Sequence, residues 1–114
     1  VYDGDSVKAI FPLNNVMYKW TCRLTGIDTP EIRTSNHLEK QYGYFVRNQL
    51  RNKILNKVVR LKCGKLDKYG RLLVEIICDE CNINQWLITN SYAFPYDGGT
   101  KRSWSEYLQE NSEQ

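Results

Sequence analysis

The sequence predicts a mainly β fold with helices (α+β), in which short strands form a small closed barrel and about three helices pack outside it. Three features of the chain support this fold class. Short segments rich in β-branched and aromatic residues alternate in polarity and are separated by turn residues. One long segment with helical periodicity lies among these strand-like segments, and shorter helical patterns follow them. The length of 114 residues suits one domain, so we expect a single domain over residues 1–114.

The first two strand-like segments are predicted to form a hairpin. Residues 7–12 and 16–25 are joined by Leu13-Asn14-Asn15, and asparagine suits a tight turn. Successive side chains of a strand point to opposite faces, so the second segment has two phases. The phase expected to face the core is apolar and largely aromatic: Val16, Tyr18, Trp20, Cys22 and Leu24. Arg23 belongs to the more polar phase and is expected to project away from the core.

Residues 36–57 have the period of an amphipathic helix. Its predicted apolar stripe consists of Tyr42, Phe45, Val46, Leu50 and Ile54. Asn36 and Glu39 resemble a capping box at the start, in which each side chain bonds the backbone N–H of the other residue. Lys40, Arg47 and Arg51 are expected on the solvated face. His37 has no partner that would indicate catalysis, so we assign it no catalytic role.

The second half of the chain predicts two more strands and two shorter helices. Strands over 58–63 and 71–78 are joined by a loop that contains residues 67–70, so Arg71 begins a strand. Asn82 is expected to cap a helix through Asn90, with Ile83, Trp86 and Leu87 facing the core. A loop over 92–100 and a last helix from Ser103 follow, anchored by Trp104 and Leu108, and the tail after about residue 110 is expected to fray. This order is typical of an OB-type barrel, although the pattern alone also fits other small β-barrels.

Composition limits the classes of function only weakly. Sixteen Lys and Arg against thirteen Asp and Glu give a net charge of +3, which permits contact with nucleic acid without requiring it. No apolar run is long enough to cross a bilayer, so we expect no membrane contact. The chain starts almost inside a strand, which leaves room for a preceding strand, signal or anchor in a longer natural protein.

The four cysteines are Cys22, Cys63, Cys78 and Cys81, and the last two have the spacing of half a zinc knuckle. A second tight pair is missing, so free thiols are favoured over structural zinc or two disulfides. Free thiols favour a location inside the cell, while a trimmed signal would leave secretion open.

Charged residues that suit phosphate chemistry gather in three motifs. The segment from Arg23 to Glu31 carries an arginine and two carboxylates, Asp28 and Glu31, with Pro30 stiffening the turn. The other two motifs are Asp3-Gly4-Asp5-Ser6 and Asp67-Lys68-Tyr69-Gly70-Arg71. Together they offer oxygen ligands for a hard cation and two guanidinium groups for a phosphate. With no histidine or clustered cysteine in these motifs, the ligands indicate Ca²⁺ or Mg²⁺ and not zinc.

The three motifs, in this order and spacing, resemble those of the staphylococcal nuclease (thermonuclease) family. The resemblance implies a five-stranded OB barrel with three helices, and it implies Ca²⁺ as the metal. It makes Asp5, Asp28 and the Thr29 carbonyl the calcium ligands, with Asp3 behind them. It also implies catalytic roles for Arg23 and Arg71 on the scissile phosphate and for Glu31 on the attacking water. Lys68 and Tyr69 match residues that contact the substrate, and Tyr96 is a looser match to a stacking tyrosine.

The function predicted in this way is a calcium-dependent phosphodiesterase that hydrolyses DNA and RNA with little sequence specificity and leaves 3′-phosphates. Single strands are expected as the preferred substrate and a monomer as the active form. Ser6 replaces the threonine that is usual in the family, and the segment around residues 97–100 follows the family only in outline. One alternative is a non-catalytic OB module that binds single-stranded nucleic acid or a protein partner. A second is an adaptor stabilised by zinc on the cysteines.

Overall fold

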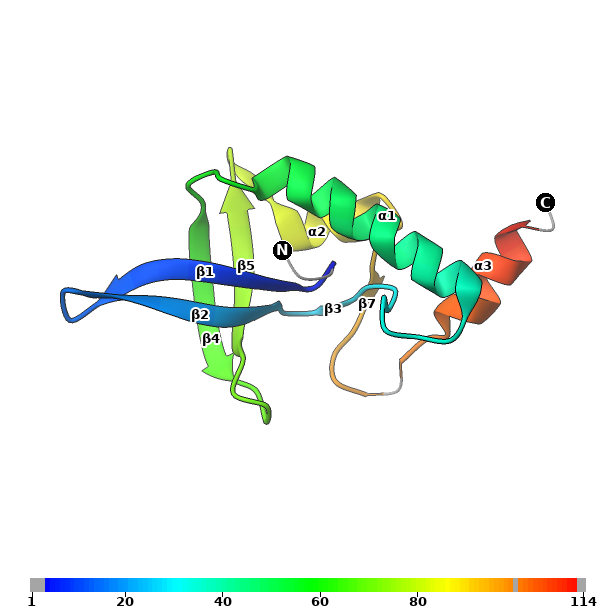
Figure 1. Ribbon diagram of the computed structural model, residues 1–114, viewed down its shortest axis with the longest axis horizontal. Coiled ribbons are helices and arrows are strands. Elements are labelled where there is room, and N and C mark those ends of the chain that lie inside the picture. Colours follow the sequence, from blue (N-terminus) through cyan, green and yellow to red (C-terminus); the bar gives the residue numbers. More distant parts are fainter. Residues whose placement is uncertain (1–3, 100, 113–114) are drawn as a thin grey trace.

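The computed structural model describes residues 4–99 and 101–112 (Figure 1). The elements follow in the order β1 (Ser6–Leu13), β2 (Val16–Leu24), β3 (Ile27–Asp28), α1 (His37–Ile54), β4 (Arg60–Leu66), β5 (Leu72–Cys78), β6 (Cys81–Asn82), α2 (Ile83–Thr89), β7 (Phe94–Pro95) and α3 (Trp104–Ser112). Five strands form one sheet, α1 and α2 lie beside it, and α3 packs on α1 away from the sheet. The predicted α+β fold class is therefore confirmed. None of the helices in the described part of the chain is both long and apolar enough to span a membrane.

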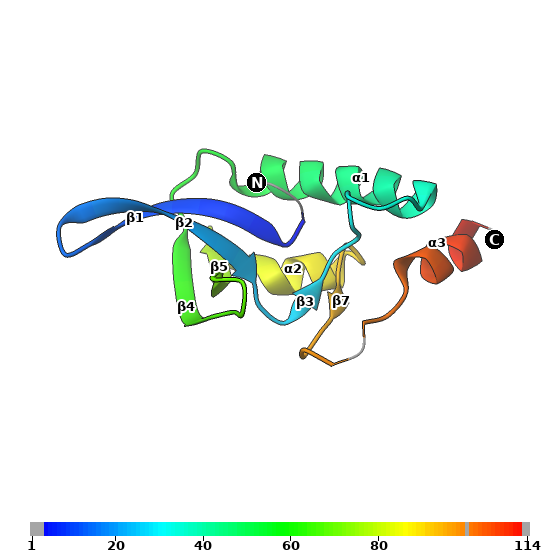
Figure 2. The ribbon, with the colours of Figure 1, turned by 60° about the horizontal axis from the view of Figure 1, so that its bottom comes forward.

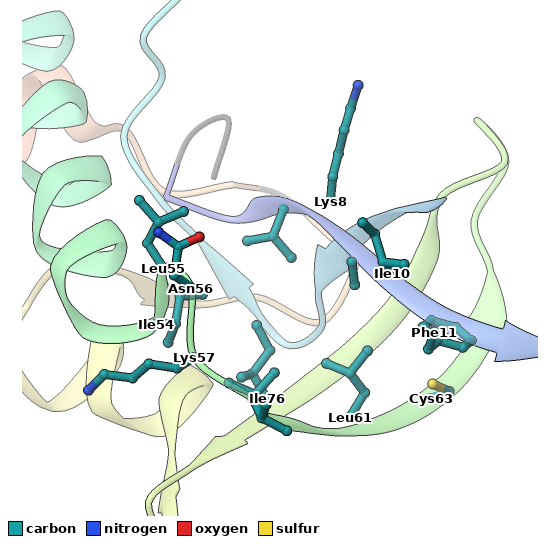
Figure 3. A pocket seen from close by; sticks show the side chains of 14 residues that line it. Lys8, Ile10, Phe11, Ile54, Leu55, Asn56, Lys57, Leu61, Cys63 and Ile76 are labelled. Atoms are coloured by element: carbon teal, nitrogen blue, oxygen red, sulfur yellow. The ribbon is translucent and has the colours of Figure 1, made fainter. Parts of the chain in front are cut away.

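The large sheet has the order β1-β2-β5-β4, with β6 paired to β5. β1 and β2 are antiparallel, β2 and β5 are parallel, and β4 and β5 are antiparallel. Within the described residues, β1 and β4 do not pair with each other. An apolar hollow of about 640 Å³ lies there instead, lined by β1, β4 and residues 54–59 (Figure 3). The barrel was expected to be closed, but in the part that the structure describes it is open between β1 and β4.

The hairpin of β1 and β2 crosses the β4–β5 pair, and its tip extends past it (Figure 1). Asn14 and Asn15 both have left-handed backbone conformations, with φ of 51° and 67°, as a two-residue hairpin turn requires. Because the tip lies beyond the body, Val16 and Tyr18 are 51% and 47% exposed, and their predicted core positions are wrong. Cys22 and Leu24 of the same phase are fully buried, and Trp20 is half-buried.

Helix α1 packs its Val46, Leu50 and Ile54 into the core, as predicted. It ends three residues before the predicted end, where Leu55 is extended and Asn56 has a φ of 60°. Phe45 was expected in the core but is 43% exposed, with its ring against Tyr42 and Tyr92. The predicted core packing of Phe45 is therefore wrong, while the helix and its buried stripe are otherwise as expected.

β5 alternates between buried and half-buried residues, and its buried side chains are Leu72, Val74, Ile76 and Cys78. β4 begins two residues later than predicted, at Arg60, and Arg71 lies just before β5. Asn82 caps α2 as predicted, through a bond from the Gln85 N–H. Trp86 is only half-buried, and Ser91, with a φ of 60°, ends the turn after α2 in a left-handed conformation.

The segment over 92–100 was predicted to be a loop without regular structure, but it contains β7. This strand pairs with β3 in a two-stranded sheet of its own, beside α2 and apart from the large sheet (Figure 2). In α3 the side chain of Trp104 is buried and stacks on Phe94, with 3.8 Å between the ring centroids. α3 continues to Ser112, two residues past the point where fraying was expected, and residues 113–114 lie outside the described residues.

Candidate active site

The acidic turn at residues 28–31 is held against the core. Asp28 lies in β3 opposite Phe94 of β7, and its exposure is 4%. A Cβ atom on Gly43 of α1 would lie 3.0 Å from the carbonyl oxygens of both Pro30 and Glu31, so a glycine there lets the turn lie directly on the helix. The Glu31 N–H donates to Glu39 Oε2 at 2.8 Å. The Asn36 side chain accepts the Glu39 N–H, as the predicted capping box requires. The Glu39 side chain was expected to bond the Asn36 backbone in return but bonds the acidic turn instead.

Asp5 reaches the same place from the turn that precedes β1. A Cβ on Gly4 would lie 2.8 Å from Val46 Cγ1 and 3.0 Å from Thr29 Oγ1. This close approach requires glycine and brings the turn before β1 against the acidic turn. The Leu24 N–H donates to the Asp5 carbonyl at 2.8 Å, and Asp5 is 8% exposed. Asp3, expected behind the metal ligands, lies outside the described residues.

The three carboxylates of Asp5, Asp28 and Glu31 interact electrostatically. Burial raises the pKa of Asp28, and the charge of Asp5 raises it further, while Lys101 and Arg23 oppose the shift. Burial also raises the pKa of Glu31, and Asp5 and Asp28 add to the effect. Carboxylates that are held close together and partly shielded from water repel one another, and a bound cation would offset this repulsion.

Arg23 supplies one of the cations. Its Nη2 lies 3.5 Å from Asp5 Oδ2, and both side chains are almost buried. Its Nη1 donates to the Leu24 carbonyl at 2.8 Å and its Nη2 to the Ile27 carbonyl at 2.9 Å. The guanidinium group is therefore fixed in direction, with the Tyr96 ring centroid 6.0 Å from its Cζ.

Arg71 is positioned by the loop over 67–71, to which we refer as the basic loop. Asp67 Oδ1 accepts the backbone N–H groups of Tyr69 and Arg71, both at 2.9 Å. Asp67 Oδ2 accepts from Arg71 Nε at 2.8 Å. Desolvation tends to raise the pKa of Asp67, but the hydrogen bonds from Arg71 and Tyr69 outweigh it and lower the pKa. Gly70, with a φ of 80°, closes the turn in a conformation that suits glycine.

The cationic residues meet around one hollow of about 730 Å³, which we call the cationic hollow. It is lined by Arg23, Thr25, Gly26, Asp67, Lys68, Tyr69, Arg71, Leu73, Tyr96, Asp97, Gly98 and Lys101. Asp5, Asp28 and Glu31 lie outside this lining. Arg23 and Lys101 connect Asp5 and Asp28 to it through ion pairs. The apolar hollow of Figure 3 is lined by other residues and holds none of the predicted site residues.

Lys101 and Asp67 are the two residues whose roles sequence reasoning missed. Lys101 Nζ lies 3.3 Å from Asp28 Oδ1 and 5.4 Å from the centroid of the Tyr96 ring. The pairing of β3 with β7 brings Tyr96 to this place, because the Tyr96 N–H donates to the Gly26 carbonyl at 2.9 Å. No local pattern signals Lys101, whereas the spacing of Asp67 and Arg71 in one short turn could have suggested their ion pair.

The residues present suit a hard cation better than zinc. No group of three or more His, Cys, Asp or Glu side chains in the described part of the chain is arranged to hold a metal, and this applies to the acidic residues of the site as well as to the cysteines. All four cysteines are free thiols, and Cys78 Sγ lies 3.9 Å from the Lys53 carbonyl. Asp5 and Asp28, by contrast, are two buried carboxylates beside the buried Thr29. This all-oxygen donor set fits Ca²⁺ with water completing the shell, although Arg23 and Lys101 now neutralise the two carboxylates.

The fold and this site define a small α+β domain that presents arginine and lysine side chains next to buried carboxylates. The chain belongs to the staphylococcal nuclease homologue family, whose model matches residues 21–113. The fold of this family is an OB-type barrel with helices, so the predicted OB type and the predicted resemblance are confirmed. The matched range begins after Asp5, so the family model does not cover this residue. The proposal that Asp5 belongs to the metal site therefore depends on its position in the structure.

Relatives of the chain include proteins named as nucleases. The chain is 32% identical to an uncharacterised protein of Methanocaldococcus jannaschii over 84% of this chain and 56% of the relative. It is 32% identical to a probable staphylococcal-like nuclease of Oryza sativa subsp. japonica, over 74% of this chain and 21% of the relative. It is 29% identical to an endonuclease of Bacillus subtilis, over 87% of this chain and 48% of the relative. The chain thus spans about half or less of the length of these relatives.

Proposed function

We propose that this domain is a calcium-dependent phosphodiesterase that cleaves DNA and RNA with little sequence preference and leaves 3′-phosphates. The observation that supports this most is the cationic hollow, where Arg23, Arg71 and Lys68 line one space next to the buried pair Asp5 and Asp28. Membership of a family with endonuclease relatives supports the reaction class. The identity of the metal, the products and the substrate preference belong to the proposal.

Attack on a phosphodiester increases the negative charge on the phosphorus oxygens in the transition state. Arginine is permanently charged and presents paired donors, so a fixed Arg71 suits this task. Asp67 orients its guanidinium group through Nε, a bond that does not use the two Nη groups, and Arg71 lines the hollow. Arg23 is fixed by two carbonyls and Asp5, so its principal effect on a phosphate is electrostatic.

Asp5, Asp28 and the Thr29 carbonyl would hold Ca²⁺, which when bound supplies a fixed positive charge beside the phosphate. Glu31 would orient the attacking water and accept its proton. Its raised pKa makes its carboxylate a better proton acceptor than an ordinary glutamate. Its backbone is held by Glu39 and packs on Gly43, while the residue itself is exposed.

Binding through phosphate contacts predicts little dependence on base sequence and a steep loss of affinity with salt. Tyr69 is 72% exposed, and both Tyr69 and Tyr96 line the cationic hollow, so splayed bases of a single strand could stack there. We therefore propose single strands as the preferred substrate and a monomer as the working form. The free thiols support our proposal of a reducing compartment.

A cleavage assay tests the function. Single-stranded DNA, duplex DNA and RNA are incubated with the domain in Ca²⁺ or in excess chelator, and the ends of the products are analysed. We expect cleavage only with Ca²⁺, fastest on single strands, with 3′-phosphate ends. A domain that binds these substrates but cuts none of them would support the non-catalytic binding module instead.

A further inference from the structure

Lys101 lies between β7 and α3 and connects the acidic turn with the cationic hollow. Its Nζ pairs with Asp28 Oδ1 at 3.3 Å, and its side chain also lines the hollow. The Asp28 side chain is 6% exposed, whereas that of Lys101 is 48% exposed. The Asp28 carboxylate is therefore fixed in the core, and the Lys101 ammonium group reaches it from the solvent side at the end of a long side chain.

The two ion pairs at the acidic site differ in how firmly the cation is held. Arg23 is 12% exposed and donates to two backbone carbonyls as well as approaching Asp5. Lys101 is held by a single 3.3 Å ion pair and by the face of Tyr96. Lysine is a compact charge on a flexible four-carbon stem, so its ammonium group can move several ångströms without any change in the backbone. Of these two cations, Lys101 is the one that can be exchanged.

Building on the proposed calcium site, we propose that Lys101 is an internal counter-ion of Asp28 that a divalent cation displaces, and that the displaced ammonium group then binds a phosphate oxygen of the substrate. The Asp28 carboxylate is one of the groups proposed to hold Ca²⁺. The Lys101 ammonium group and a Ca²⁺ ion beside the same carboxylate oxygen would repel each other strongly. The displaced ammonium group remains at the cationic hollow, where the substrate phosphate would be its next anion.

This exchange couples the two ligands of the site. A phosphate that draws Lys101 away from Asp28 leaves the carboxylate open to Ca²⁺, so phosphate should raise the calcium affinity. By linkage, Ca²⁺ should raise the phosphate affinity by the same factor. Removing the ammonium group should weaken this coupling and leave only the direct attraction between Ca²⁺ and the phosphate. It should also shift the two affinities in opposite directions, which a purely structural role for Lys101 would not do.

Calorimetric titration of the folded domain with Ca²⁺ measures the first effect. Lys101→Met, which keeps the length of the side chain and removes the charge, should bind Ca²⁺ about fivefold more tightly, the upper scale for a partly exposed ion pair. Lys101→Arg keeps the charge and should stay near the wild-type affinity. Lys68→Met is the matched control, because Lys68 lines the same hollow and its ammonium group lies over Tyr69, 5.3 Å from the ring centroid. It should leave the calcium affinity nearly unchanged.

The second titration uses thymidine 5′-monophosphate, which contains no phosphodiester bond and cannot be cut. With Ca²⁺ present, Lys101→Met should bind it about fivefold more weakly than the wild type. The nucleotide should tighten calcium binding more in the wild type than in Lys101→Met. Equal calcium affinities for wild type and Lys101→Met, or an equal gain in Lys68→Met, would overturn the role of Lys101.

A measurement on the unaltered chain gives the same answer if Lys101→Met fails to fold. Adding Ca²⁺ should shift the side-chain amine resonances of Lys101 in NMR spectra and leave those of Lys68 in place. Unshifted Lys101 signals at saturating Ca²⁺ would overturn the exchange while leaving the calcium site intact. A wild-type domain that binds no Ca²⁺ would overturn both the calcium site and the exchange.

Discussion

The acidic turn and the basic loop hold their charged side chains in different ways. Asp5 and Asp28 are placed by close packing, since a Cβ atom on Gly4 or Gly43 would lie only about 3 Å from atoms of the acidic turn. Arg71 is placed by one carboxylate within its own turn, because the Asp67 side chain accepts two bonds from Arg71 and one from the Tyr69 N–H. The first arrangement depends on the core, and the second depends on five consecutive residues.

This difference separates stability from activity. A change near the acidic turn should affect folding and chemistry together, because the same contacts serve both. A change in the basic loop should affect chemistry with little effect on folding, because the loop is exposed and its bonds are local. The variants below test this contrast, beginning with the largest expected effect.

Asp5→Asn should reduce calcium-stimulated cleavage to background, because the amide keeps the shape of the side chain and removes its charge from the proposed metal site. Arg23 would lose its carboxylate partner in a nearly buried place, so the melting temperature should also fall. Both effects are measured by fluorescent-substrate cleavage and thermal unfolding. Asp97→Asn is the control, since Asp97 is an exposed carboxylate beside the same hollow. If Asp5→Asn in excess chelator still cleaves as fast as the wild type does with Ca²⁺, the assignment of Asp5 to the metal site is wrong.

Asp67→Asn should lower turnover by roughly tenfold, because one lost positioning interaction weakens an electrostatic contact that depends on orientation. The amide oxygen can still accept the backbone N–H groups, so the melting temperature near neutral pH should change little. Asp79→Asn removes a more exposed carboxylate, which pairs with Lys57 at 3.7 Å, and should not affect turnover. A large drop in melting temperature for Asp67→Asn without loss of turnover would reverse the contrast between the two regions.

The difference in stability between the wild type and Asp67→Asn should depend on pH. The pKa of Asp67 is lowered in the folded state, so its carboxylate contributes stability above the usual aspartate range of about 4. That contribution is lost as the pH falls through the lowered pKa. The small stability difference between wild type and Asp67→Asn should therefore shrink in acid. Unfolding curves at several pH values check this, and a difference that grows toward low pH would contradict the assignment.

Gly43→Ala should destabilise the fold by about 1–2 kcal/mol, although alanine favours helices by up to about 1 kcal/mol. The new methyl group would lie 3.0 Å from two carbonyl oxygens of the acidic turn, which cannot rotate away. Glu31 should shift, and turnover should fall by a few fold. Gly64→Ala is the control, because its nearest contact would be 3.4 Å. An unfolding midpoint for Gly43→Ala at or above that of the wild type would show that the turn does not depend on this contact.

Local signals in the sequence predicted most of the elements. The alternation around Trp20, the stripe from Val46 to Ile54 and the caps at Asn36 and Asn82 each depend on neighbours within a few residues. The errors have non-local causes. Tyr18 fits the core phase of β2 but lies where the hairpin leaves the body, and β7 forms only because β3 is present to pair with it.

The candidate site also combines residues that local sequence motifs identify with one that only the folded chain brings into place. The motifs identified Asp5, Arg23, Asp28, Glu31 and Arg71, and the structure brings the first four together and places Arg23 and Arg71 around one hollow. The role of Lys101 could not be predicted, because its contact with Asp28 spans the chain from β3 to the segment before α3. The catalytic roles themselves stay predictions.

Arg71→Lys tests the central claim, that a guanidinium held by Asp67 meets charge that develops only as the phosphodiester breaks. Single-turnover cleavage and equilibrium binding of a single-stranded oligonucleotide are measured for the wild type and the variant, with binding recorded in chelator. Lysine keeps the charge and loses the planar pair of donors, so the cleavage rate should fall by roughly a hundredfold while affinity changes far less. An unchanged cleavage rate, or a loss that appears entirely in the affinity, would contradict the account.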